Sequence, residues 1–369
     1  MAKIRHFFPG GNTCYGFYSF YDYLVSPFVS RKIILKGGPG VGKSTLMHQI
    51  GEYFSANGYD IEYHWCSSDN NSIDGVVIGN HKIALLDGTA PHIVEPRYPG
   101  AVDEIINLGQ FWDRGQIVSH RESIVKLTSL VSLNFTRAYR RLREAKLAYE
   151  EWESYYEEAQ DMIAVNRNIL ALTDDFIEQC SPIGLQRHLF YGAITPQGLV
   201  TTLESLIDQN YSLFAITGSP GSGIKHLFKH TTNMLTLNNL ECEILHNPFN
   251  PDEIDLIILP SMQRALINVS GNLIPVRSSL SGGKYRRQLD FDRFLCTDTI
   301  NSCMNLIENA RDRTKAGIKD AISFVNWAKR YHDELEGCYV PAMDIEQLSK
   351  LRDTLIEEIE QQLRSNGEG

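Results

Sequence analysis

The first third of the chain alternates short apolar runs with one amphipathic segment. An apolar run at 32–36 leads into a glycine-rich loop, and a segment of helical character follows at 44–57, where Asn57-Gly58 is a typical helix stop. Two further runs, at 61–65 and 83–87, have the composition of buried strands, and each ends in polar residues. Strands that alternate with helices predict an α/β fold, with a parallel sheet and crossover helices.

A long helical segment follows this unit. Residues 119–179 contain no glycine or proline and are rich in Leu, Arg, Glu and Tyr. Pairs of opposite charge such as Arg140–Glu144 and Lys146–Glu150 recur at i, i+4, as on an exposed helix face. We therefore expect a long helical arm or a helical hairpin, and a second arm at about 299–363 that is interrupted near Gly337 and Pro341.

The whole pattern occurs twice. The loop at 37–45 recurs at 218–226, and 12 of the 57 positions from 37 to 93 are identical at an offset of 181 residues. Chance at average composition would give roughly three or four. Matches at offsets of 182 and 183 extend the repeat to the N-terminal segment and to the arms. The sequence predicts two tandem P-loop NTPase units, 1–182 and 183–369, each with its own arm.

The first loop has the form GxxxxGK[ST], the Walker A motif. In such a loop the glycines let successive backbone N–H groups turn toward phosphate oxygens, the lysine reaches the β- and γ-phosphates, and the hydroxyl binds Mg²⁺. We therefore predict that the first unit binds a nucleotide. The predicted contacts are Gly38, Pro39, Gly40, Val41, Gly42, Lys43, Ser44 and Thr45.

Two aspartates extend this predicted site. Mg²⁺ also requires a carboxylate, commonly at the end of an apolar strand, and Asp87 ends the run at 83–87. Asp69 follows the other predicted strand and is a weaker candidate for positioning water or substrate. Its alternative role is that of a turn or helix-cap residue.

The second loop lacks this chemistry. Ile224 stands where Lys43 does, Lys225 where Ser44 does, and Asn268 where Asp87 does. Because the three groups are lost together while the loop glycines remain, we predict that the second unit is non-catalytic. The alternative is that its loop still binds an anion through the backbone, with Lys225 as a displaced substitute.

Arginines behave differently in the two units. Arg137, Arg140 and Arg141 lie at i, i+3 and i+4 in the first arm, and none of their counterparts in the second arm is basic. They form either a lid over the phosphates or a solvated helix face that pairs with neighbouring glutamates. Arg5, in contrast, is matched by Arg187, which predicts a structural role or a contact between the two halves.

Bulk properties exclude several classes of protein. A net charge of −10 argues against general nucleic-acid binding, because a phosphate backbone demands a basic face. No apolar run approaches the ~18 residues that cross a bilayer, and the chain start lacks the apolar segment of a signal peptide. Seven scattered cysteines without a CxxC pair indicate neither zinc nor disulfides. We expect a cytoplasmic protein of undetermined oligomeric state.

Longer motifs resemble a poorly characterised bacterial family of tandem P-loop ATPases, found mainly in spore-forming Gram-positive lineages. The stretches that carry the resemblance are 5–13, 36–45, 66–70, 86–92, 99–109 and 339–344. The resemblance implies the fold and ATP binding but no established substrate. Family members often have a better-preserved second loop, so Ile224 is a departure from the family.

A looser resemblance is to nucleoside-monophosphate kinases, through the loop at 37–43 and the pair Asp87-Gly88. No NKxD motif follows, which argues against a GTPase switch, and no glutamate follows Asp87. Three functions therefore stand at this point. They are a Mg²⁺-dependent ATPase active in the first unit, a phosphotransferase acting on a nucleotide or small molecule, and an ATP-gated scaffold that engages a protein partner through its arms.

Overall fold

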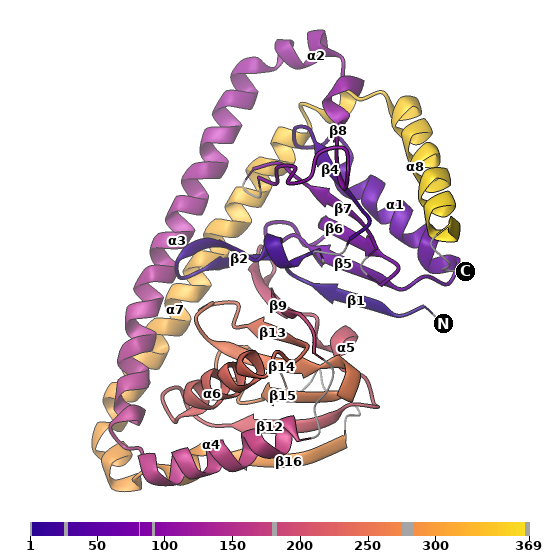
Figure 1. Ribbon diagram of the computed structural model, residues 1–369. Helices are drawn as coiled ribbons and strands as arrows, with labels where there is room; N and C mark the ends of the chain where they lie inside the picture. The colour runs from indigo at the N-terminus through magenta and orange to yellow at the C-terminus, as the bar shows by residue number, and fades with distance from the viewer. Residues whose placement is uncertain are drawn as a thin grey trace.

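The computed structural model describes residues 2–25, 29–80, 82–90, 93–178, 183–274, 276 and 284–365. It consists of two α/β lobes, one above the other in Figure 1, and two long helices that run beside both. The predicted division of the chain at residue 182 lies outside the described residues.

Each lobe is built on a six-stranded sheet, and the two sheets have the same strand order. In the first lobe the strands, in spatial order, are β1 (Ile4–Phe7), β5 (Ile61–Trp65), β6 (Ile73–Ile78), β7 (Ile83–Asp87), β4 (Arg31–Lys36) and β8 (Asp103–Asn107). The equivalent strands of the second lobe are β9 (Gln186–Phe190), β13 (Cys242–His246), β14 (Ile254–Leu259), β15 (Arg264–Asn268), β12 (Ser212–Thr217) and β16 (Lys284–Asp290). The α/β class and the repeat are thus visible in the topology.

The predicted parallel sheet with crossover helices is confirmed only in part. Strand β6 pairs antiparallel with both β5 and β7, and β14 does the same in the second lobe. The cause is chain length. The connections at 66–72 and 79–82 are shorter than the dozen or so residues that a parallel crossover needs. The sheets are therefore mixed, although most of their strand pairs are parallel.

Two small hairpins and several short helices complete the lobes. The hairpins are β2 (Gly10–Thr13) with β3 (Gly16–Ser19), and β10 (Gly192–Thr195) with β11 (Gly198–Thr201). The short helices are η1 (Tyr21–Tyr23), η2 (Leu108–Phe111), α2 (Arg114–Ser119), α5 (Leu203–Leu206), η3 (Pro260–Met262), η5 (Phe291–Phe294) and η6 (Val340–Ala342).

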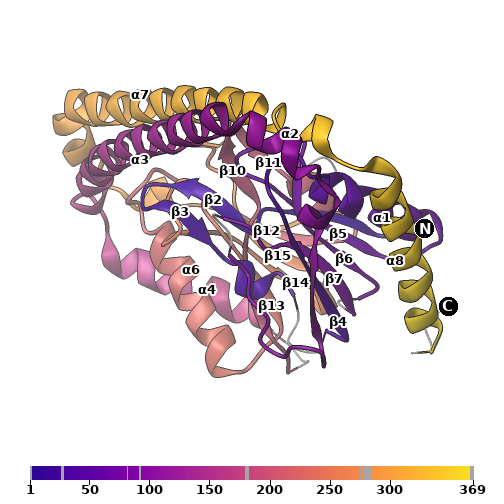
Figure 2. The same ribbon diagram turned by 90° about the horizontal axis from the view of Figure 1, so that it is seen from above.

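The two arms form an antiparallel helix pair. Helices α3 (Arg121–Glu157) and α7 (Thr297–Glu336) lie side by side along one side of both lobes (Figure 2). Small residues allow this close approach, since a Cβ placed on Gly317 of α7 would lie 2.9 Å from the Cβ of Ala145 in α3. Ala138 and Ala321 are fully buried in the same contact. The predicted arms are therefore confirmed as helices.

Each arm ends on the opposite lobe. Helix α8 (Ile345–Ser365), which follows α7, buries Leu355 and Ile359 in the core beneath α1 (Lys43–Ala56) of the first lobe. Helix α4 (Met162–Ile177), which follows α3, buries Val165 and Ile169 against α6 (Ile224–Leu237) of the second lobe. The repeats therefore exchange their last helices, and each lobe in space contains sequence from both (Figure 1).

The lobes meet along β1 and β9. The backbones of Phe8 and Phe190 exchange two hydrogen bonds there, at 3.1 and 3.0 Å. Beside them, Arg5 pairs with Glu243 of the other lobe, and Arg187 pairs with Glu62 across the same interface. The predicted contact of the matched arginines with the boundary between halves is confirmed.

Among the described residues, no helix combines the length and apolar character that crossing a membrane requires.

Candidate functional site

The glycine-rich loop at 37–45 joins β4 to α1 at the carboxyl edge of the first sheet. Three of its glycines have backbone torsions with φ between 68° and 148°, a region that L side chains rarely adopt. The equivalent glycines of the second loop have φ between 81° and 158°. These residues are Gly37, Gly40 and Gly42 in the first loop and Gly218, Gly221 and Gly223 in the second. The two loops therefore share one backbone form.

The Lys43 ammonium lies inside the first loop. Its side chain is 9% exposed, and Nζ donates hydrogen bonds to the carbonyl oxygens of Gly37 at 3.1 Å and Gly38 at 2.9 Å. The Asp87 carboxylate lies 3.6 Å from the same nitrogen. The loop thus holds a nearly buried cation at its centre.

Ser44 and Asp87 lie at the same edge of the sheet. The Ser44 hydroxyl accepts a hydrogen bond from the Ile73 N–H at 3.0 Å, which fixes it beside the start of β6. One Asp87 oxygen accepts bonds from the Thr89 N–H and hydroxyl at 2.8 and 2.5 Å, while the other faces Lys43. The structure therefore brings together Lys43, Ser44 and Asp87.

A second carboxylate lies beside Asp87. Asp74 of β6 stands opposite Asp87 of β7, since the antiparallel register pairs the neighbouring residues Gly75 and Leu86. In the second lobe the equivalent residues, Asp255 and Asn268, share a hydrogen bond of 2.9 Å that the Asn268 amide donates. Where the second lobe sets an amide against a carboxylate, the first lobe sets two carboxylates, an arrangement that a bound cation stabilises.

Asp69 is a turn residue. Its carboxylate accepts hydrogen bonds from the Asn71 N–H at 3.0 Å and from the Ser72 hydroxyl at 2.9 Å. The Lys329 ammonium of α7 lies 3.4 Å from it. This geometry matches the turn alternative for Asp69, and it ties the loop after β5 to the arm of the second repeat.

The structure does not bring Arg137, Arg140 and Arg141 to the loop. The Arg141 side chain pairs with Glu144 and approaches Asp320, and the Arg137 guanidinium lies over the Phe324 ring. Helix α7 meets the loop at its last residue, Glu336. This residue lies about 18 Å along the helix from Phe324, at 1.5 Å per residue. All three arginines are exposed, which is the arrangement of a solvated helix face rather than of a phosphate lid.

The end of the second arm covers the first loop instead. A Cβ placed on Gly38 would lie 3.2 Å from the Tyr339 ring, and one on Gly40 would lie 3.0 Å from the Val340 side chain and 3.1 Å from the Glu336 carbonyl oxygen. A side chain at either loop position would therefore press on the end of the second arm. The backbone of Asp113 also donates to the Ala342 carbonyl at 2.7 Å, which fixes this part of the arm on the first lobe.

One group of side chains near this contact has the composition of a metal site. His332, Asp333 and Glu336 on the last turns of α7 have ligand atoms within 4.8 Å of one another. It is the one such group among the described residues, and its side chains are partly or fully exposed. Exposed carboxylates at this spacing are common on helices, so the group by itself identifies no ligand.

The second loop is occupied by the protein's own groups. The Ser219 N–H and hydroxyl both donate to the Asp292 carboxylate, at 2.7 and 3.0 Å, and Gly109 stands at the position of Asp292 in the first lobe. The Gln160 amide donates to the Gly221 carbonyl. Ile224 is buried in the core, and Lys225 is exposed. A carboxylate thus takes the N–H that a phosphate would need.

A group of buried acids lies near the second loop, where the Glu153 backbone meets Gly221. Burial and the neighbouring Glu253 raise the pKa of Glu153 to about 7. Burial also raises the pKa of Glu253 and of Asp255. A raised pKa keeps an acid protonated to a higher pH, so these groups carry less negative charge than free carboxylates, and the ammonium groups of Lys225 and Lys146 oppose the rise for Glu153 and Glu253.

Comparisons of the chain with protein-family models, curated proteins and solved structures give no match. The assignment of a function therefore rests on the two sites as they are built, and on the difference between them.

Sequence reasoning missed the residues that the second arm contributes to the first lobe. Glu336, Tyr339 and Val340 lie about 300 residues from the loop in sequence, and nothing local indicates which lobe they reach. The available signal was the set of alanines that both arms share at the same positions, which predicts close packing of one arm against the other.

Proposed function

We propose that the first lobe binds Mg·ATP at the loop 37–45 and hydrolyses it slowly. Lys43 would exchange its two bonds to loop carbonyls for bonds to the β- and γ-phosphates. Ser44 and Asp87 would hold Mg²⁺, which supplies Lewis-acid stabilisation of the charge on the phosphates. The paired carboxylates of Asp74 and Asp87 favour a cation at this edge of the sheet.

One observation supports this proposal most directly. Lys43, Ser44 and Asp87 converge at one sheet edge in the first lobe. At the equivalent positions of the second lobe, Ile224 is buried in the core, Lys225 is exposed and Asn268 is bonded to Asp255. Since the backbone of the two loops is alike, the side chains alone distinguish them.

A second candidate is an ATP-gated switch without appreciable turnover. It is favoured by the contact of Tyr339 and Val340 with the first loop, because a nucleotide that displaced this contact would move the arm. No glutamate follows Asp87 to activate water. A phosphotransferase has less support, because the arginines that would serve as its lid lie on the exposed face of α3.

Phosphate release separates these functions. Wild-type protein, Lys43→Ala and the matched control Lys225→Ala would be incubated with Mg·ATP, with and without a panel of nucleoside monophosphates. We expect slow release that Lys43→Ala abolishes and Lys225→Ala leaves within about twofold, since the second loop is filled by Asp292. ADP formation that jumps with one monophosphate, without a matching rise in free phosphate, would identify a kinase. ATP binding without release would identify a switch, and no binding of ATP would refute all three functions.

A further inference from the structure

The second lobe contains a cavity at one edge of its sheet. It lies at the carboxyl ends of β12, β15 and β16 and consists of two adjoining hollows of about 460 and 530 Å³. Both are lined by Thr217, Val269 and Asp290, and we call them together the second-lobe cavity. A volume of this size is in the range of small-molecule sites.

Comparison of the repeats explains why the cavity exists. Ile34 and Lys36 on one face of β4 are replaced by Ala215 and Thr217 on β12. In the first lobe these two side chains fill the space, since a Cβ placed on Gly88 would meet Ile34 and lie 3.3 Å from the Cε of Lys36. Val269 stands at the position of Gly88 and refills only part of the vacated volume.

The first lobe identifies the chemistry of the missing group. The Lys36 ammonium donates to the carbonyl oxygens of Gly88 at 2.8 Å and Val94 at 2.9 Å, and to the Glu95 carboxylate at 2.7 Å. Three acceptors match the three donors of a primary ammonium. This corner of the first lobe is therefore built around an alkylammonium group that the chain itself supplies.

The second lobe keeps one backbone hydrogen bond of this corner, has Val276 in place of Glu95 at the same offset of 181 residues, and places a carboxylate on the neighbouring strand. The Val269 N–H donates to the Ile216 carbonyl at 2.8 Å, as the Gly88 N–H donates to that of Leu35 at 3.0 Å. Asp290 pairs in register with Thr217, where the first lobe pairs Asn107 with Lys36. The cation of the first lobe is thus absent, and an acid has replaced a neutral amide beside its position.

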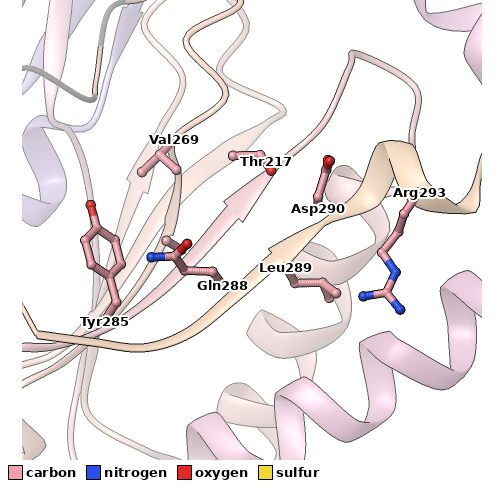
Figure 3. Close-up of a pocket in the computed structure, with 8 residues that line it drawn as sticks. Thr217, Val269, Tyr285, Gln288, Leu289, Asp290 and Arg293 are labelled. Carbon is pink, nitrogen blue, oxygen red and sulfur yellow. The ribbon is translucent and has the colours of Figure 1, made fainter.

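Figure 3 shows how the lining side chains are directed. The side chains of Val269, Thr217 and Asp290 lie in a row along the upper part of the view, whereas the Arg293 guanidinium points downward, away from them. One Asp290 oxygen accepts a bond from the Asp292 N–H at 3.1 Å, which orients the carboxylate. Tyr285 and Gln288 lie at the other end and supply a hydroxyl and an amide.

We propose that the second-lobe cavity binds a small organic ammonium ion, the group that Lys36 supplies covalently in the first lobe. The ammonium pairs with the Asp290 carboxylate and the Val269 carbonyl, and its alkyl chain lies along Ala215 and Val269. The binding is non-covalent and reversible. It is independent of the proposed ATP site, which lies in the other lobe.

The test uses n-butylammonium chloride, which reproduces the side chain of lysine, and n-butanol as its neutral control. Titration of the full chain by calorimetry at constant ionic strength should show saturable binding of one butylammonium, and butanol should bind at least tenfold more weakly. Thr217→Lys should abolish binding, because the new side chain fills the cavity with its own ammonium, while Thr217→Ser should retain it. Equal binding of butanol, or unchanged binding by Thr217→Lys, would overturn the proposal.

Two further variants keep the test decisive if Thr217→Lys fails to fold. Asp290→Asn should weaken butylammonium binding at least tenfold, because the carboxylate is the charged partner. Lys36→Thr should open the equivalent corner of the first lobe and raise the stoichiometry from one to two. Unchanged affinity in the first variant, or a stoichiometry of one in the second, would contradict the proposed recognition.

Discussion

In the first loop a nearly buried lysine donates to the Gly37 and Gly38 carbonyls, whereas in the second loop a carboxylate accepts from the Ser219 N–H and hydroxyl. The backbones differ little, since the same three glycines have positive φ in each. The difference teaches that one loop shape can enclose either a buried cation or a carboxylate supplied by the protein itself. In the second lobe that shape receives Asp292 and the end of α3.

The two arms, in contrast to the two loops, make equivalent contacts in both lobes. Tyr339 and Val340 contact the first loop, and the Glu153 backbone contacts the second loop at Gly221. Each loop is therefore covered by the arm of the other repeat. Both arms have this structural role, whereas Lys43, Ser44 and Asp87 occur together in one lobe only.

The largest expected effect on stability comes from the interface that the lobes share. Arg5→Ala should cost about 3–5 kcal/mol of unfolding free energy, because the buried Glu243 loses its hydrogen-bonded partner and keeps only the longer contact with Arg187 at 3.6 Å. Although burial opposes ionisation, Arg5 holds the pKa of Glu243 below its usual range. Denaturant unfolding would measure the loss. The exposed Arg143→Ala is the control and should change stability by less than about 0.5 kcal/mol.

Alanine substitutions at three glycines with positive φ measure how tightly the arms pack against the loops. Gly58→Ala should cost about 1 kcal/mol from backbone strain alone, because no atom lies within 4 Å of the new Cβ. Gly40→Ala should cost about 1–3 kcal/mol more, and Gly221→Ala more again, because their methyl groups meet backbone of the arms. Thermal unfolding would rank the variants, and equal losses for all three would contradict the packing of arms on loops.

Acid should remove the stability that the buried His246 contributes to the second lobe. Burial and the nearby His188 lower the pKa of His246 to about 4 in the folded chain, against 6.5 for the free side chain. The unfolded chain then binds more protons between these values, so His246 contributes stability above pH 6.5 that is lost as pH falls toward 4. The loss amounts to roughly 3 kcal/mol at 1.36 kcal/mol per pH unit.

His246→Gln should flatten this part of the stability profile, which urea unfolding at several pH values would measure. Trp65 stands at the equivalent position of the first lobe and cannot titrate. The exposed His226→Gln is the matched control and should leave the slope unchanged. The same slope in both variants would assign the acid sensitivity to other groups.

Much of the fold could be predicted because its signals are local. The apolar runs at 61–65 and 83–87 coincide with β5 and β7, and the predicted helix at 44–57 differs from α1 by one residue at each end. The candidate site residues Lys43, Ser44 and Asp87 could be predicted because the Walker A motif and the comparison of the two repeats require only the sequence. They converge at one edge as expected.

The remaining features depend on contacts distant in sequence. Strand β6 was missed although its neighbours were found, and its short connections decide its direction. The position of α8 on α1 depends on the pairing of α3 with α7, which brings the end of each arm to the other lobe. The arginines of α3 were offered as a lid because they occur in one repeat, but helix geometry holds them on the solvent face.

The central claim is that one loop of the two binds a nucleotide. The most direct test is an equilibrium titration of a fluorescent ATP analogue with Mg²⁺ into wild type, Lys43→Ala and Lys225→Ala. We predict one site per chain, a loss of at least about 100-fold in Lys43→Ala, and a change within about twofold in Lys225→Ala. Two sites per chain, or equal loss in both variants, would contradict the account.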